Sequence, residues 1–142
     1  MDQGAILGPL WAMMGLTLVV WVYMFVRRIP FIQSSGLTPE DLAVPGRLAE
    51  ASPPDVSNPS DNLKNLFELP VLFYAALLAL YASGQVDSVH VWCAWLFFVF
   101  RCLHSIVHCT VNVVMLRFAL YAAASVALWV MIARGLMAHF AG

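Results

Sequence analysis

The chain has 142 residues, of which 62% are hydrophobic and only 11% are charged, and its formal net charge is -1. Soluble domains are about half apolar and about a quarter charged, so this composition excludes an ordinary soluble protein and indicates an integral membrane protein. The length suits a single domain, residues 1–142. The balanced charge excludes a nucleic-acid partner, which needs a basic patch.

Four stretches are long enough to cross a bilayer, which takes about 20 apolar residues. The first is expected at about 6–27 and ends at Arg27-Arg28. Its apolar stretch is longer than that of a signal peptide, and its basic residues follow rather than precede it. The sequence therefore predicts a first helix that is retained in the membrane.

A polar loop is expected next, at about 30–59, because this segment is rich in proline and in acidic side chains. A short helix near 39–50 fits within it. Asn58-Pro59 resembles a helix N-cap followed by proline at the first helical position, so the second helix is predicted at about 60–82 and starts outside the bilayer.

The third helix is predicted at about 89–112 and the fourth at about 114–138. Basic residues are unequally shared between the two sides of these crossings. Only Arg134 lies on the side of the termini, whereas the side of the long loop has Arg27, Arg28, Arg47, Lys64 and Arg117. The positive-inside bias therefore places the long loop in the cytoplasm and both termini outside.

Polar residues are concentrated in two of these helices. The second begins with Asn65, Glu68 and Pro70, and the third carries Arg101, His104, Ser105, His108 and Asn112. At about 100° per residue, the five side chains of the third helix fall within an arc of about 100°. Ionisable residues inside a membrane usually face a bundle interior or a cavity. The sequence therefore predicts a polar pocket between membrane helices.

Plainer interpretations of the same residues stay open. Glu68 and Arg101 are also suited to a purely structural ion pair. His104 and His108 have the i, i+4 spacing of a two-point metal site, but no third ligand accompanies them and no metal is expected. Arg117 also suits an interfacial anchor on the positive side. The three cysteines of the third helix are explained as small hydrophobic residues.

Three motifs together resemble those of the MAPEG superfamily, the membrane-associated proteins of eicosanoid and glutathione metabolism. They are Asn65-x-x-Glu68-x-Pro70, Arg101-x-x-His104 and Arg117-x-x-x-Tyr121. The resemblance implies an all-α bundle of four transmembrane helices that forms a homotrimer and takes glutathione as co-substrate. It implies that Arg117 is catalytic and lies near the thiol. It further implies that glutathione is bound by Asn65, Glu68, Arg101, His104 and Tyr121. Lys64 and His108, which lie on the same two helices, are predicted to bind it as well.

Some positions depart from the family pattern. Asp61 stands where relatives that use glutathione carry an arginine, His108 where several carry a tyrosine, and Phe118 where a serine is frequent. Asp61 weakens the case for a ligand with two carboxylates. The run His-Ser-x-x-His-Cys-Thr resembles that of bacterial members, which implies a bacterial inner membrane.

Two functions follow as expectations. The first is a glutathione-dependent transferase or peroxidase that acts on a hydrophobic electrophile or a lipid hydroperoxide arriving from the bilayer. The alternative is a non-enzymatic trimer that binds a lipid or a partner membrane protein, with the polar cluster as structural glue. The superfamily contains such a non-catalytic member, the five-lipoxygenase-activating protein.

Overall fold

The computed structural model describes residues 2–141, and the regular elements of this part of the chain are all helical. They are η1 (Gln3–Ile6), α1 (Leu7–Ser34), α2 (Pro39–Ala43), α3 (Arg47–Ala51), α4 (Pro54–Leu66), α5 (Leu69–Ser83), α6 (Ser88–Cys109) and α7 (Val114–Ala141). Four segments are long and apolar enough to cross a membrane, and α4 and α5 together make the second of them. The expectation of an all-α protein with four crossings is therefore confirmed.

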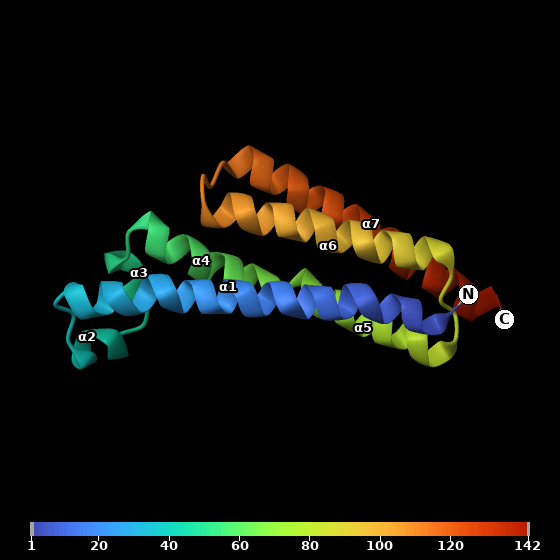
Figure 1. The fold of residues 1–142 in the computed structure, drawn as a ribbon, viewed down its shortest axis with the longest axis horizontal. Coiled ribbons are helices and arrows are strands. Elements are labelled where there is room, and N and C mark those ends of the chain that lie inside the picture. The colour runs from blue at the N-terminus through green and yellow to red at the C-terminus, as the bar shows by residue number, and fades with distance from the viewer. Residues whose placement is uncertain (1, 142) are drawn as a thin grey trace.

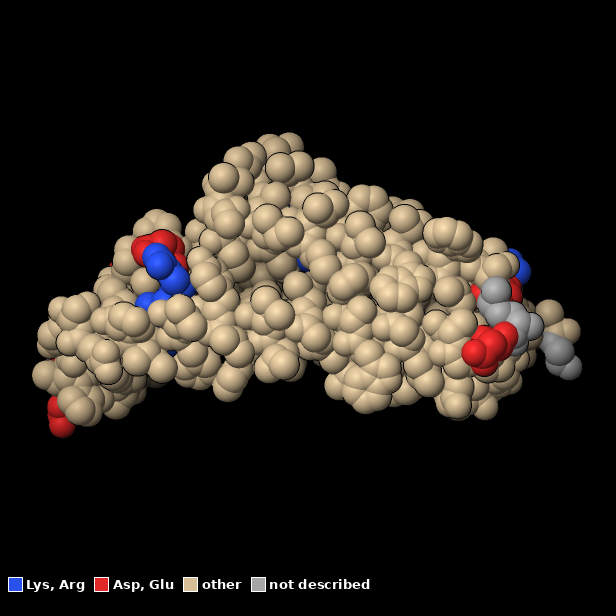
Figure 2. Space-filling model, in the orientation of Figure 1, with Lys and Arg blue, Asp and Glu red and all other residues tan. Residues whose placement is uncertain are grey.

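The helices form two layers, and within each layer neighbouring segments run antiparallel (Figure 1). The hairpin of α6 and α7 lies against α1 and the α4–α5 segment. Both chain termini lie at one end, called here the terminal end, and α2 and α3 lie at the other, the loop end. The core between the layers is apolar, and within it the rings of Phe73 and Phe97 stack with their centroids 4.4 Å apart. Charged side chains gather toward the two ends of the molecule in Figure 2.

The first helix is longer than expected, because α1 continues beyond Arg27 to Ser34. Arg27 and Arg28 do not mark its end but fasten it to α4. The Arg28 Nη2 donates to the Ser60 hydroxyl at 2.6 Å, and Arg27 forms an ion pair with Asp55. Side-chain bonds to a neighbouring helix thus stabilise a stretch of α1 that the sequence assigned to the loop.

The second helix also differs from the prediction. It begins at Pro54, and Asn58 and Pro59 lie within its first turns instead of capping it. Proline lacks an N–H, so Pro59 leaves the carbonyl of Asp55 without its helical partner. The Nε of Arg27 donates to that carbonyl at 3.3 Å. The expected loop of about 30–59 is therefore shorter and contains α2 and α3.

The second crossing is broken rather than continuous. The α4 helix ends at Leu66, and Glu68 has φ -100° and ψ -108°, which is not helical. Pro70 explains the break, because its ring clashes with the carbonyl of residue i−4, here Leu66, and it cannot donate the next helical hydrogen bond. The α5 helix therefore starts afresh at Leu69, with Pro70 in its first turn.

The third helix is shorter than predicted, since α6 ends at Cys109. Asn112, which was expected on its polar face, lies in the turn that follows, with φ 47°. Asparagine tolerates this left-handed conformation better than most residues. The Asn112 N–H donates to the Val107 carbonyl at 2.7 Å and closes the end of the helix.

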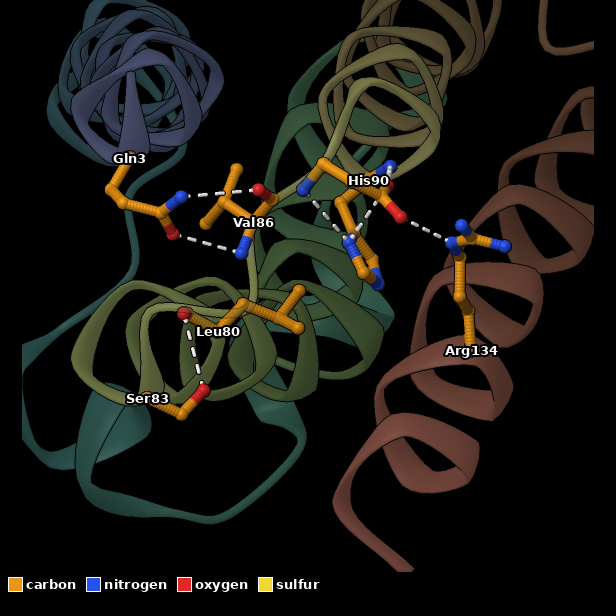
Figure 3. A network of polar contacts seen from close by, with 7 residues as sticks. Gln3, Leu80, Ser83, Val86, His90 and Arg134 are labelled. Atoms are coloured by element: carbon orange, nitrogen blue, oxygen red, sulfur yellow. Dashed lines mark hydrogen bonds and ion pairs between the residues drawn. The ribbon is translucent and has the colours of Figure 1, made fainter. Parts of the chain in front are cut away.

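At the terminal end, a group of polar contacts fixes where α6 begins (Figure 3). The Gln3 side chain bonds both the N–H and the carbonyl of Val86, at 2.9 and 3.2 Å. Asp87 caps α6 by accepting from the His90 N–H at 3.0 Å, and it accepts from the Arg134 Nε at 2.5 Å. Burial acts to raise the pKa of the Asp87 carboxyl, but the bonds from His90 and Arg134 outweigh it and lower the pKa.

These contacts predict how Asp87 contributes to stability. Asp87→Ala removes the cap and should cost about 1 kcal/mol, whereas Asp87→Asn retains a capping oxygen and should cost less. Since the folded-state pKa lies below the unfolded value of about 3.9, the contribution of the charge is present above that pH and is lost as the pH falls through the folded-state pKa. Thermal unfolding at pH 7 and pH 3 measures this, and an equal gap between wild type and Asp87→Asn at both pH values contradicts it.

Candidate functional site

Arg101 lies at the centre of a polar cluster formed by α4, α6 and α7. Its side chain is fully buried, and its Nη2 donates to the backbone carbonyl of Asn65 at 2.8 Å. The guanidinium also lies over the Tyr121 ring, 5.8 Å from its centroid. The Nε and Nη1 atoms have no hydrogen-bond partner among the described residues. Arg101 therefore presents a buried positive charge with two free donor nitrogens.

His104 complements this cation with an acceptor. Its Nδ1 lies 3.0 Å from the Arg117 carbonyl. A carbonyl only accepts, so Nδ1 carries the hydrogen, and in the neutral ring Nε2 is left as a bare acceptor. That Nε2 is buried and has no partner among the described residues. The His104 ring contacts those of His108 and Tyr121, with centroids 5.6 and 6.1 Å apart.

Three asparagines of α4 bind this helix to the α6–α7 hairpin. Asn62 is fully buried, accepts from the Ser105 hydroxyl at 3.3 Å and donates to the Cys109 sulfur at 3.5 Å. Asn58 and Asn65 flank it on the same face, because residues four and three apart on a helix are neighbours. Sequence reasoning missed Asn58 and Asn62. Their spacing with Asn65 could have indicated a shared helix face. However, the sequence placed Asn58 in the loop, and it placed the start of the second helix outside the bilayer.

Arg117 is held in place by the turn before α7. Its Nη1 donates to the Asn112 Oδ1 at 2.6 Å, and the Asn112 Nδ2 donates to the Asn58 Oδ1 at 3.0 Å. The side chain of Arg117 is half-buried at the edge of the cluster. The left-handed turn at Asn112 therefore positions the guanidinium that the sequence singled out.

Three further charged side chains lie at the exposed edge of the cluster, called here the rim: Asp61, Lys64 and Glu68. The Lys64 Nζ pairs with the Asp61 carboxylate at 2.8 Å, and both side chains are more than half exposed. Glu68 forms no ion pair with Arg101 within residues 2–141, so the structural ion pair left open by the sequence is not found. The partner of Arg101 is the Asn65 carbonyl instead.

The predicted site residues thus divide into two groups. The structure brings together Arg101, His104, His108, Arg117 and Tyr121 around the Asn65 backbone. Lys64 and Glu68 stay outside on the rim. Among the described residues, no three His, Cys, Asp or Glu side chains gather to hold a metal ion. The cluster therefore has the chemistry of an anion site with a neutral acceptor beside it.

Two cavities lie elsewhere in the molecule. One of about 380 Å³ lies between α5 and α7 toward the terminal end, and one of about 630 Å³ lies on the outer face of α1. Neither is lined by residues of the polar cluster. The buried side chains of Arg101 and His104, each with nitrogen atoms that have no partner among the described residues, identify the candidate site better than cavity size does.

The burial of Arg101 predicts its effect on stability. A buried charge with few partners is costly, and an apolar residue of similar volume is often neutral or stabilising in its place. Arg101→Met should therefore leave the melting temperature of the detergent-solubilised protein equal or higher. Arg134→Met, which breaks the bond to Asp87, serves as the control and should lower it. A large fall for Arg101→Met would show that the cation is structural.

The conformation of Asn112 supports a paired prediction. Asn112→Gly keeps the backbone free to adopt φ 47° but removes the side chain that holds Arg117. Asn112→Ala removes the same side chain and adds about 1 kcal/mol of backbone strain. Both variants should release Arg117, and only the alanine variant should show the extra loss in thermal unfolding. Equal stability of the two variants would contradict the left-handed turn.

Comparison with known protein families places the chain in one of them. The profile of the MAPEG family matches residues 6–137, which is nearly the whole chain and includes every residue of the cluster. No curated protein and no solved structure is significantly similar to the chain. Together with four helices that are long and apolar enough to cross a membrane, the match identifies an integral membrane protein. The chain belongs to the MAPEG family.

Proposed function

We propose that the chain is a glutathione-dependent transferase or peroxidase that acts on a hydrophobic electrophile or a lipid hydroperoxide in the membrane. The observation that supports this most strongly is Arg101. Its guanidinium is fully buried, and two of its nitrogens lack a partner within the described chain. A protein stabilises such a charge poorly by itself, so a buried cation of this kind favours an anionic ligand.

The residues of the cluster suit glutathione chemically. Arg101 supplies donors for a carboxylate, and the bare Nε2 of His104 supplies an acceptor for an N–H group. Tyr121 forms an aromatic wall under the guanidinium. In this proposal Asn65, Glu68, Lys64 and His108 bind the remaining polar groups of the ligand. Glutathione supplies a nucleophilic sulfur when it is bound.

Arg117 is the proposed catalytic residue. A fixed positive charge favours a thiolate over a thiol, and an environment of low polarity strengthens that effect. Arg117 stays charged in proteins, and Asn112 fixes the direction of its guanidinium. The side chain of Arg117 therefore stabilises negative charge on sulfur at a defined place.

The surroundings of Arg117 favour a hydrophobic second substrate. Met115 and Phe118 lie beside it in sequence and are 75% and 64% exposed. Exposed apolar side chains at this density mark a surface for lipid or for another protein. We propose that they face the bilayer or a neighbouring subunit of a homotrimer, so that a membrane-dissolved substrate reaches the guanidinium. The loop end is proposed to face the cytoplasm of a bacterial inner membrane.

One observation favours the alternative of a non-enzymatic trimer that binds a lipid or a partner. Arg117 is already bonded to Asn112, and Lys64 to Asp61, so two of the cations have partners within the chain. In that case the cluster serves to hold α4, α6 and α7 together, and glutathione has no measurable affinity.

The proposal predicts the behaviour of Arg117 variants. Arg117→Ala should abolish turnover with a model electrophile and weaken glutathione binding only moderately, because the loss concerns the thiolate rather than the rest of the ligand. Arg117→Lys keeps the positive charge but loses the planar arrangement of hydrogen-bond donors. This variant should therefore retain partial activity. Isothermal titration and thiol-consumption assays on detergent-purified protein measure both. Wild-type protein that neither binds nor consumes millimolar glutathione would rule out the enzyme and favour the alternative.

A further inference from the structure

The rim of the cluster carries one excess negative charge. Asp61 and Lys64 neutralise each other through their 2.8 Å ion pair, and Glu68 is exposed beside them without an ion pair among the described residues. Lys64, the only positively charged side chain of the rim as defined above, is thus already in an ion pair. An arriving carboxylate has to displace Asp61 from Lys64 or lie close to two carboxylates.

The interior of the cluster has the opposite character. Arg101 is fully buried, and its Nε and Nη1 have no hydrogen-bond partner among the described residues. The two nitrogens lie on opposite sides of the guanidinium, so each can donate to a carboxylate oxygen separately, and its single charge matches one carboxylate. Arg117 already donates a hydrogen bond to Asn112 and, in the proposed function, stabilises the negative charge on the sulfur. His104 contributes a neutral acceptor, not a charge, to the space near Tyr121. The interior is therefore suited to one carboxylate in addition to the sulfur.

The rim and the interior are connected through Asn65. The backbone carbonyl of Asn65 accepts from Arg101, and the side chain of Asn65 donates to the backbone carbonyl of Asp61 at 3.3 Å. A ligand held by Arg101 therefore lies near the negative rim.

We propose that this site selects a thiol with one carboxylate and one ammonium group over glutathione, which has two carboxylates, and that Asp61 determines this selectivity. The proposal rests on the proposed function, because it assumes that a thiol binds in the cluster. The single carboxylate binds Arg101 and the ammonium group faces the negative rim. The second carboxylate of glutathione meets Asp61 and Glu68 and weakens binding.

The size of the effect follows from the rim charges. Two unit charges about 4 Å apart in water interact by about 1 kcal/mol, which corresponds to about a fivefold change in affinity. The difference should be larger at low salt, because the rim is exposed and screened by ions. Wild-type protein should therefore bind a monocarboxylate thiol about fivefold more tightly than glutathione.

Titration calorimetry with three probes tests the proposal. The probes are glutathione, its glycyl monoethyl ester and the dipeptide cysteinylglycine, each of the latter two with one carboxylate fewer. At least one of these two should bind wild type about fivefold more tightly than glutathione does. Asp61→Asn, which frees Lys64, should raise glutathione affinity about fivefold and should leave the affinity of the monocarboxylate probes unchanged or lower it.

Glu50→Gln serves as the matched control, because it removes an exposed carboxylate of α3 outside the cluster and should change none of the affinities. Tighter binding of glutathione than of both other probes overturns the selectivity but leaves the proposed function intact. An unchanged glutathione affinity in Asp61→Asn overturns the role of Asp61. Absence of binding by all three probes overturns the proposed function and the selectivity together.

Discussion

The bond from Arg101 to the Asn65 carbonyl is the interaction on which the polar interior of this protein depends. A guanidinium in the middle of a membrane bundle needs an acceptor, and a regular helix has none to spare, because its carbonyls bond the N–H groups one turn later. Pro70 removes one such donor and ends α4 at Leu66. In this broken stretch the Asn65 carbonyl accepts from the Glu68 N–H at a long 3.4 Å and also accepts from Arg101 at 2.8 Å. A proline on one helix thus makes a cation on another tolerable.

The same principle recurs at α1. Pro59 leaves the Asp55 carbonyl without its helical donor, and the Nε of Arg27 bonds it at 3.3 Å. At Pro59 the proline frees the carbonyl that Arg27 binds, and at Pro70 the proline breaks the helix beside the carbonyl that Arg101 binds. Three basic side chains, Arg27, Lys64 and Arg134, pair with acids, whereas Arg101 has the Asn65 carbonyl as its acceptor instead of an acid. This explains why Glu68 stays exposed on the rim while Arg101 is buried.

The sequence predicted the four crossings and the polar face of α6, because both depend on local hydropathy and on helical periodicity. It predicted the grouping of Arg101, His104 and His108 for the same reason. It did not predict the helix ends, since these depend on tertiary bonds. The extension of α1 needs Ser60 of α4, and the early start of α4 needs Arg27. The role of Asn112 depends on a left-handed turn that no periodicity reveals.

The break in the second crossing also has a consequence for the surrounding lipid. The α5 helix has 15 residues, so it spans about 22 Å, which is less than the hydrocarbon core of about 30 Å. A hydrophobic segment that is too short is accommodated by local thinning of the bilayer. Where α5 alone contacts lipid, the bilayer is expected to be thinner, and the headgroups at the loop end then lie closer to the break at Glu68. In the proposed function, a water-soluble thiol and a lipid-dissolved partner then meet at one level near this break.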